Sequence, residues 1–462
     1  MRGPPGDRAL AALLLAALLR LAPALTPSPP PPPPPSGLAF ESSSATLNAA
    51  FAFAVPMALS YLETGKDPSF IPSYWAGLLD RPAFYARDMA HQALGAHLLG
   101  LDAENLAMLR VFAASATATP ARRLFPLWSF DFKGAIYPLD YHSDDDYVRE
   151  TPTPFDLLVS AARLQNWTAD NRYRDDPALW AAWSAFVVGD FVPLHDPLND
   201  GIAGQASPSG NIFAGAASYV ENGEGMVVAG DALAKQFAAF EAYSEWQAQL
   251  GNASGAALTR AAADRLSELY QVAWYSATQG YARGINKAAG MVFGYLDTQS
   301  VFPGTSFLLA PGPRADAHVT SIVANARASG TELRTYVPEL LFAFGRPDDA
   351  AAYISQLVAD ARNTYPEVSF TLVADLVAHM LGIEPAPGGG NGGALLLRTL
   401  GANLPSNTSF ATARGVPVCG RAVTVTQGVD AASGAASTAL SLAPGGPGGE
   451  LTWEARFRLA LC

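Results

Sequence analysis

Apolar residues recur with the 3.6-residue period of amphipathic helices over most of the chain, from about Ser44 to Gly382. These segments are rich in Ala, Leu, Glu and Gln, which favour helix, and Gly, Pro and Asp turns separate them. The pattern predicts about eleven or twelve helices arranged as consecutive hairpins. The predicted helices cover residues 47–63, 81–99, 103–115, 154–164, 177–191, 225–250, 255–273, 318–328, 338–344, 348–362 and 369–381.

Two connecting segments, 120–154 and 194–224, are too long to be ordinary turns. The first is rich in aromatic and acidic residues, and within it 130–132 and 135–137 flank Lys133-Gly134 as two short strands would. Structureless connections of this length in a compact domain are usually functional, so we expect these two segments to contribute to a site.

The composition and the pattern of apolar residues change after residue 385. Residues 386–414 form a glycine-rich linker, and 415–462 contain three stretches that alternate apolar and polar residues, 417–426, 438–442 and 451–457. We therefore expect a helical domain over residues 41–385 followed by a small β unit over residues 415–462.

The N-terminal segment has the features of a secretory signal peptide over residues 1–25. Arg2 and Arg8 precede an apolar core of Ala and Leu, and Ala22-Pro23-Ala24 offers small residues before a cleavage site. A membrane anchor or a transit peptide are the alternatives. Residues 26–40 form a proline-rich linker, a stiff polyproline II spacer. We predict a secreted or extracellular protein, with the cell wall or the endomembranes as alternative locations. We predict no membrane insertion beyond the signal segment.

Composition narrows the function classes. The 462 residues carry a net charge of −12 and the pI is about 5.0, without the basic stripe of a nucleic-acid-binding protein. The two cysteines, Cys419 and Cys462, either form a disulfide or remain free thiols. Sequons at Asn166, Asn252 and Asn407 agree with a secreted glycoprotein.

The predicted helix over residues 81–99 carries a polar face inside an otherwise apolar segment. Asp88, His91 and Gln92 lie at positions i, i+3 and i+4, beside Arg87. Polar side chains on such a helix either pair internally or face a ligand-filled cavity. His91 is expected to donate to a ligand hydroxyl or to pair with Asp88 in the core.

Three stretches carry a resemblance to a known family. They are RDMAHQ (residues 87–92) with the following GAHLLGLDAENLAMLR, YVRETPTPFDL (147–157) continuing to WTADNRY (167–173), and YPEVSF (365–370). Together they resemble the six-hairpin glycosidase superfamily, with LTWEARF (451–457) similar to the closing β element of some members. The resemblance covers roughly residues 44 to 460 and implies a mainly α fold, an (α/α)6 toroid of helical hairpins with a small C-terminal β unit.

The resemblance implies hydrolysis of glycosidic bonds in oligo- or polysaccharides, in a funnel at one end of the toroid. Aromatic rings suit the apolar faces of sugars, and polar side chains suit their hydroxyl groups. The expected substrate-binding residues are Trp75, Arg87, His91, Gln92, Trp128, Tyr141 and Tyr365.

Such hydrolysis requires two carboxyl groups, one protonated to assist the leaving oxygen and one that activates water. The candidates are Asp88, Glu150, Glu367 and, in reserve, Glu332. Asp88 is an acid or sugar ligand, or instead a helix N-cap or buried partner of Arg87. Glu150 projects into the mouth of the site, or forms a surface ion pair with Arg149 or another base.

Glu367 is the expected general base, because it lies at a helix N-terminus whose dipole favours the ionised form. The same position also suits an acidic residue that only stabilises the first helical turn. Glu332, in a loop before a helix, is otherwise a solvated acid. With Glu367 as base and Asp88 or Glu150 as acid, the expected reaction is inverting hydrolysis.

No cofactor or metal is expected. The acidic run at residues 144–146 after His142 could bind calcium, but such a run is usually solvated. One alternative function is a non-catalytic glycan-binding protein on the same fold, favoured by the Gly- and Ala-rich stretch 286–307. The other is a polysaccharide lyase, which the lack of a basic cluster disfavours.

Overall fold

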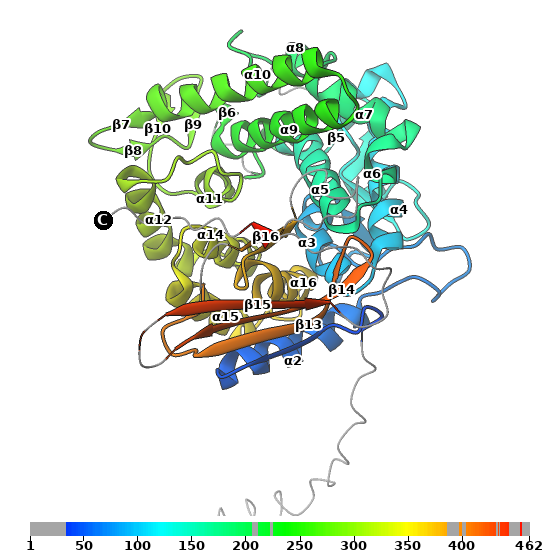
Figure 1. Ribbon diagram of the computed structural model, residues 1–462. Coiled ribbons are helices and arrows are strands. Elements are labelled where there is room, and N and C mark those ends of the chain that lie inside the picture. The colour runs from blue at the N-terminus through cyan, green and yellow to red at the C-terminus, as the bar shows by residue number, and fades with distance from the viewer. Residues whose placement is uncertain are drawn as a thin grey trace, which may run out of the picture. The chain divides into compact units, whose positions relative to one another are not determined.

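The computed structural model describes residues 34–205, 211–221, 225–385, 397–399, 403–430, 433, 435–442 and 453–454. Within this part of the chain, six helices form a closed inner ring in which each packs on the next (Figure 1). The inner helices are α3 (Ala86–Leu98), α5 (Pro152–Thr168), α9 (Gly230–Gln249), α11 (Asp297–Thr305), α14 (Val337–Ala343) and α16 (Pro366–Ala374). A π-helical continuation of α16, Asp375–His379, contacts α14, and α16 itself packs on α3.

Outer helices alternate with the inner ones along the chain and pack against them from outside. They are α2 (Ala45–Ser60), α4 (Asp102–Thr117), α7 (Pro177–Val187), α10 (Ala253–Val272), α12 (Pro313–Asn325) and α15 (Pro347–Ala359). Short helices lie in the connections: α6 (Arg172–Asp175), α8 (Phe191–Leu194) and α13 (Thr331–Thr335). Alternation of outer and inner helices around a closed ring is the (α/α)6 toroid, so the predicted fold class is confirmed.

Helix starts follow local sequence signals. Ser44 accepts a hydrogen bond from Leu47 N at the start of α2, and Asp176 accepts from Ala178 N and Leu179 N at the start of α7. Helix α11 carries no comparable signal: the apolar period predicts no helix there, because Pro303 and Gly304 interrupt it and both its polar and its apolar residues are buried.

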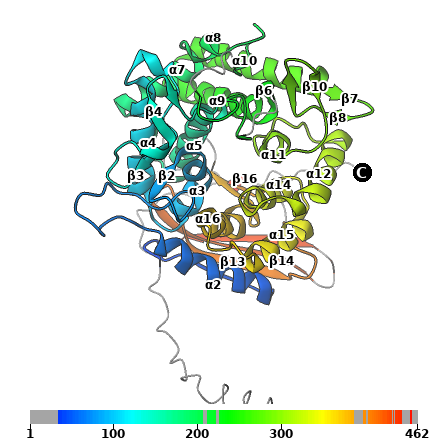
Figure 2. The ribbon, with the colours of Figure 1, turned by 180° about the vertical axis from the view of Figure 1, so that it is seen from behind.

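The long connections hold short strands at the N-terminal ends of inner helices. β2 (Ala83–Tyr85) runs directly into α3 and pairs with β3 (Ser129–Asp131), as Figure 2 shows from behind. The predicted pairing of 130–132 with 135–137 is reduced to an isolated bridge between Phe130 and Ile136, because β3 pairs with β2 instead.

Other short strands pair within the remaining connections. β6 (Met226–Ala229) leads directly into α9 and pairs with β9 (Gly284–Asn286), which also pairs with β10 (Gly290–Val292). β4 (Tyr141–Ser143) pairs with β5 (Asp146–Tyr147), and β7 (Tyr275–Ser276) pairs with β8 (Gly280–Tyr281).

The C-terminal sheet has the order β1–β13–β14–β15 and contacts α2, α3 and α5. Its strands are β1 (Ala39–Ser42), β13 (Phe410–Val418), β14 (Arg421–Val429) and β15 (Ala436–Leu442). The sheet thus also uses residues before 415 and two from the expected linker 26–40. A second small sheet joins β11 (Ile383–Pro385), β12 (Leu397–Thr399) and β16 (Trp453–Glu454).

The predicted strand 417–426 is wrong as a single strand. Cys419 and Gly420, at φ 48° and 72°, form a two-residue turn between β13 and β14. Positive φ at both central residues is typical of the turn that matches the twist of a hairpin. The signal segment 1–25 and Cys462 lie outside the described residues, so the signal peptide and the Cys419–Cys462 pairing stay predictions. None of the described helices is long and apolar enough to span a membrane.

Candidate active site

Acidic and hydroxyl side chains gather where the inner helices begin. Because each outer helix returns the chain, the inner helices all run in one direction and their N-termini share one end of the ring. The partial positive charge of helix N-termini favours acidic side chains there. The residues concerned are Asp88 on α3, Glu150 two positions before α5, Asp231 on α9, Thr298 on α11, Glu332 on α13 and Glu367 on α16.

Arg87 is the cationic centre of this group and is only 7% exposed. Its Nη1 donates to the backbone carbonyl of Tyr219 at 3.2 Å and lies 3.9 Å from Glu150 Oε1. Its Nη2 forms an ion pair with Glu332 Oε1. Arg87 therefore joins two of the predicted carboxyl groups, and its guanidinium also lies 5.3 Å from the centre of the Tyr219 ring.

Glu150 is buried, with a relative exposure of 1%, which excludes its reading as a surface ion pair. Trp128 Nε1 donates to Glu150 Oε2 at 2.8 Å, whereas Oε1 has no hydrogen-bond partner among the described residues. The segment before β6 covers this position, since Thr151 N donates to the carbonyl of Ala216 at 2.8 Å. Burial raises the pKa of the Glu150 carboxyl well above its ordinary value.

Glu367 is fully buried in the first turn of α16. Tyr336 Oη donates to its Oε1 at 3.3 Å, and His91 Nδ1 lies 3.1 Å from the same oxygen. Oε2 has no hydrogen-bond partner among the described residues. The His91 ring stacks on that of Tyr336, with centres 3.6 Å apart and planes 9° apart, so both groups are held in place.

The expectation that the helix dipole keeps Glu367 ionised is corrected by its burial. Loss of water raises the pKa of the Glu367 carboxyl well above its ordinary value, and the charge of Glu332 raises it further. A dipole contributes less than the full desolvation of a carboxylate costs.

Asp88 is buried at the base of the site and accepts a hydrogen bond from Tyr365 Oη. It is not the N-cap of α3, a position held by Tyr85, and His91 is paired with Glu367 rather than with Asp88. Burial, followed by the nearby charge of Glu367, raises the pKa of Asp88 well above its ordinary value.

Other predicted residues lie elsewhere. Gln92 Nε2 donates to the backbone carbonyl of Trp75 at 3.3 Å, and Trp75 Nε1 donates to Glu63 Oε1 at 2.6 Å. Tyr141 Oη donates to Asp144 Oδ1 at 3.0 Å. The structure thus brings together Arg87, Asp88, His91, Trp128, Glu150, Glu332, Tyr365 and Glu367. No described contact joins Trp75, Gln92 or Tyr141 to the four candidate catalytic carboxyl groups.

The acidic run 144–146 is engaged in ion pairs: Asp144 with Arg122 at 2.7 Å and Asp146 with His142 at 2.8 Å. Within the described part of the chain, no group of three or more His, Cys, Asp or Glu side chains is placed to hold a metal ion.

A second layer of polar groups lies along the inner helices below the carboxyls, and sequence reasoning missed it. Tyr219 Oη donates to Asp156 Oδ2 at 3.1 Å, and Lys235 Nζ lies 2.7 Å from Asp156 Oδ1. Lys235 also lies 4.4 Å from the centre of the Phe302 ring. The i, i+4 spacing of Asp231 and Lys235 in an Ala-rich helix was the signal that could have revealed this layer.

A partly buried ionic cluster follows farther along α5 and α14. Glu339 lies 3.1 Å from Arg163 Nη1 and 3.8 Å from His379 Nε2. Burial alone would raise the pKa of Glu339, but Arg163 and His379 together lower it to about 2. Burial lowers the pKa of His379 to about 4 and that of His91 to about 3, so both imidazoles are neutral near pH 7.

Comparison with solved structures shows what this architecture is similar to. A GH78 family rhamnosidase of Bacillus sp. GL1 matches 91% of this chain and 43% of its own, at 13% identity and a TM-score of 0.64. An α-L-rhamnosidase from Dictyoglumus thermophilum matches 85% and 43%, at 12% identity and a TM-score of 0.56. A sialidase matches 87% and 40%, at 8% identity and a TM-score of 0.59.

The chain has a glycoside hydrolase-like fold. It spans less than half the length of these structures, and identities this low establish the fold alone. No protein-family profile matches the sequence, and no curated protein matches it. The resemblance to six-hairpin glycosidases is therefore confirmed at the level of the fold, while the chemistry depends on the site described above.

Proposed function

We propose that the protein hydrolyses glycosidic bonds of oligo- or polysaccharides. The observation that carries this proposal is the pair Glu150 and Glu367, two buried carboxyl groups at one end of the helical ring, each with one oxygen that has no hydrogen-bond partner among the described residues. Buried polar atoms are almost always hydrogen-bonded, and an exception at the N-termini of converging helices is where a substrate or a water is expected to bind. The glycoside hydrolase-like fold supports a carbohydrate substrate.

In the proposed reaction Glu150 is the general acid. Burial raises its pKa, and a group that gives a proton to the leaving oxygen must be protonated. Glu367 is the general base and removes a proton from the attacking water. The two hydrogen-bonding groups at its Oε1, Tyr336 Oη and His91 Nδ1, fix the carboxyl and leave Oε2 for that water. The expected stereochemical outcome is inversion.

The remaining groups would bind the sugar. The Asp88 carboxyl suits sugar hydroxyls, and Arg87 holds Glu150 and Glu332 in a fixed relation. Trp128, which donates to Glu150, positions the proposed acid. As part of the same proposal, the protein is secreted with a signal peptide and acts on extracellular or cell-wall carbohydrate.

The test is a screen of residues 34–462 against neutral oligosaccharides and aryl glycosides, with the variants Glu150→Gln and Glu367→Gln. Glu384→Gln, at an exposed position on β11, is the matched control. We expect both site variants to lose at least about 100-fold in kcat/KM and the control to lose none.

The two roles are separated by the leaving group. Glu150→Gln should keep more activity on aryl glycosides with acidic phenols, which leave without a proton, whereas Glu367→Gln should lose activity on all substrates alike. Binding of oligosaccharide without turnover in every form would replace this proposal by that of a glycan-binding protein.

A further inference from the structure

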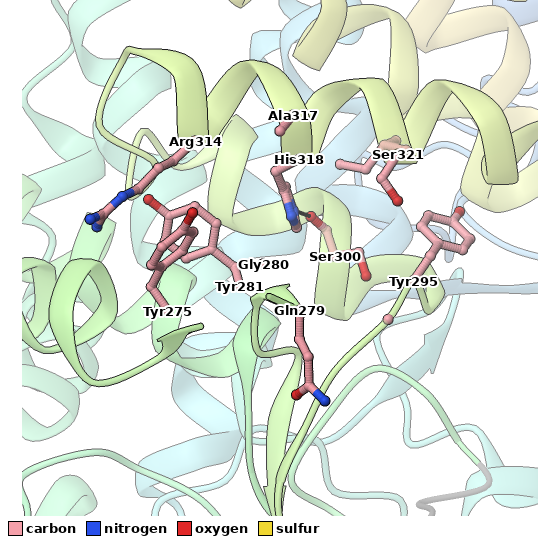
Figure 3. A pocket seen from close by; sticks show the side chains of 12 residues that line it. Tyr275, Gln279, Gly280, Tyr281, Tyr295, Ser300, Arg314, Ala317, His318 and Ser321 are labelled. Atoms are coloured by element: carbon pink, nitrogen blue, oxygen red, sulfur yellow. Dashed lines mark hydrogen bonds between the residues drawn. The ribbon is translucent and has the colours of Figure 1, made fainter. Parts of the chain in front are cut away.

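A pocket of about 220 Å³ lies outside the group of carboxyls, between the β7–β8 hairpin, the start of α11 and the outer helix α12 (Figure 3). Tyr275 and Tyr281 form one side of it, His318 and Ser321 hang from α12, and Tyr295 lies on the other side. The proposed reaction uses none of these residues.

The wall formed by the hairpin is fixed by ring packing. Tyr281 stacks on Tyr270, with ring centres 4.9 Å apart and planes 4° apart. The guanidinium of Arg314 lies 4.0 Å from the centre of the Tyr275 ring, and Arg314 Nη1 donates to the carbonyl of Gln271 at 3.2 Å. Arg314, the charged residue of the lining, is therefore engaged with the wall rather than held free for an anionic ligand.

Tyr295 differs from the other two tyrosines. Its hydroxyl is paired with Ser329 Oγ at 3.1 Å, but none of the described aromatic rings stacks on it. Its ring is half-buried and lines the pocket. A phenol ring anchored at one end and unstacked at its face is a suitable surface for the apolar face of a sugar.

The polar groups of the lining include both donors and acceptors. His318 Nε2 lies 2.8 Å from the backbone carbonyl of Ser300, which only accepts, so the proton is on Nε2 and Nδ1 remains an acceptor. Burial lowers the pKa of His318 and keeps the ring neutral. The exposed side chains of Ser321 and Gln279 supply a hydroxyl and an amide. A ligand with several hydroxyl groups and no charge matches this lining.

We propose that this pocket binds one neutral sugar residue of the polymeric substrate at a distance from the bond being cleaved. Its volume is small for a ligand site, which fits a single ring rather than an oligosaccharide. Tyr295 is also linked to the segment that carries Glu332, because Ser329, which pairs with the Tyr295 hydroxyl, precedes Glu332 by three positions. The identity of the ligand as substrate rests on the proposed function.

The experiment is a ligand-observed saturation-transfer NMR titration with D-glucose, D-galactose, D-mannose and L-rhamnose. It is performed on the wild-type chain, Glu367→Gln, Tyr295→Leu, Tyr295→Phe and Ser321→Trp. Tyr295→Leu removes the planar face, while Tyr295→Phe removes only the hydroxyl. Ser321→Trp fills the pocket from an exposed helical position. Thermal unfolding is recorded for each variant.

At least one of the sugars should bind the wild type, with affinity reduced tenfold or more by Tyr295→Leu and by Ser321→Trp. The affinity of Tyr295→Phe should stay within about twofold of wild type, because stacking depends on the ring. The affinity of Glu367→Gln should also stay within about twofold, because the pocket lies outside the group of carboxyls. Binding that survives Ser321→Trp, binding lost equally in Tyr295→Phe, or no binding of any of the four sugars would overturn the proposal.

The turnover assay separates this inference from the proposed function. If sugar binding depends on Tyr295 but the chain has no hydrolytic activity, the proposed sugar pocket stands and the proposed hydrolase function is rejected. If turnover depends on Glu367 but sugar binding is unaffected by the changes at Tyr295 and Ser321, the proposed hydrolase function stands and the proposed sugar pocket is rejected.

Discussion

Glu367 and His91 meet at 3.1 Å although 276 positions separate them in the sequence. The contact joins the last inner helix, α16, to the first, α3, where the ring of helices closes. The imidazole lies flat on Tyr336, which also donates to Glu367, so three segments of the chain hold one carboxyl group. The proposed base is thus assembled only when the ring is closed.

The first prediction concerns the pH dependence of hydrolysis. Burial raises the pKa of Glu367, so its base form accumulates only above the usual carboxyl value of about 4.5. Burial likewise keeps Glu150 protonated to higher pH. We expect a bell-shaped profile of kcat/KM with both limbs displaced upward from the ordinary glutamate range. A rate that is already maximal at pH 4 would contradict the assignment.

The second prediction concerns stability. A carboxyl whose pKa is higher in the folded than in the unfolded state stabilises the fold below the unfolded pKa, and this contribution is lost as the pH rises through the folded pKa. Glu367→Gln replaces the carboxyl by a neutral group of similar size. The variant should therefore melt at a higher temperature than wild type at pH 8, with a gain that shrinks toward pH 4.

Calorimetry or thermal circular dichroism at pH 4, 6 and 8 measures this gain, at roughly 2 °C for each kcal/mol. Glu384→Gln, at an exposed position, should show no difference at any of the three pH values. A Glu367→Gln protein less stable than wild type at pH 8 would mean that the carboxylate is stabilised in the folded state.

Much of the fold could be predicted from the sequence, because outer helices have one apolar and one polar face. Helix α10, for example, buries Thr259, Ala263, Leu266 and Tyr270 at helical spacing, so its apolar period can be recognised in the sequence. Helix α11 could not be found in this way, since an inner helix is surrounded by protein and Pro303 and Gly304 do not mark a helix. The predicted strand ends were wrong where the turn Cys419-Gly420 lies inside a stretch of alternating apolar and polar residues.

The site was predicted where local sequence concentrates polar residues, as with Arg87, Asp88 and His91 on α3. Partners from distant segments were not predictable, because pairing depends on how the ring closes. Asp88 pairs with Tyr365, and His91 pairs with Glu367. The sequence of α3 on its own suggests instead that Asp88 and His91 pair with each other. The helix dipole also misled the prediction that Glu367 is ionised, since burial is a property of the whole fold.

The third prediction tests Arg87. Its positive charge lowers the pKa of Glu150 against the effect of burial. Arg87→Met should reduce kcat/KM at least about 100-fold and move the high-pH limb of the profile to higher pH, because the acid then loses the neighbouring cation. Arg87→Lys should keep the limb near its wild-type position while losing activity, since an ammonium group cannot contact Glu150, Glu332 and Tyr219 together. An unmoved limb in Arg87→Met would show that Arg87 acts on structure alone.

The fourth prediction concerns the approach of α3 to α16. A Cβ at Gly95 would lie 2.0 Å from the backbone oxygen of Phe370, so the two helices touch through their backbones there. In an unobstructed helix, replacing glycine by alanine stabilises by about 0.5–1 kcal/mol. Here the sign should reverse, because neither backbone can move without parting His91 from Glu367, and Gly95→Ala should destabilise by about 2 kcal/mol or more.

Gly330→Ala is the matched control for that substitution. Gly330 has an ordinary φ of −60°, and nothing lies within 4 Å of a Cβ built there. Urea unfolding should place this control within about 0.5 kcal/mol of wild type. Hydrolytic activity adds a second readout: Gly95→Ala should lower kcat even at temperatures where it is fully folded, since separation of α3 from α16 displaces the proposed base. A Gly95→Ala protein as stable and as active as the control would show that the ring tolerates such a separation, and that the His91–Glu367 contact does not depend on it.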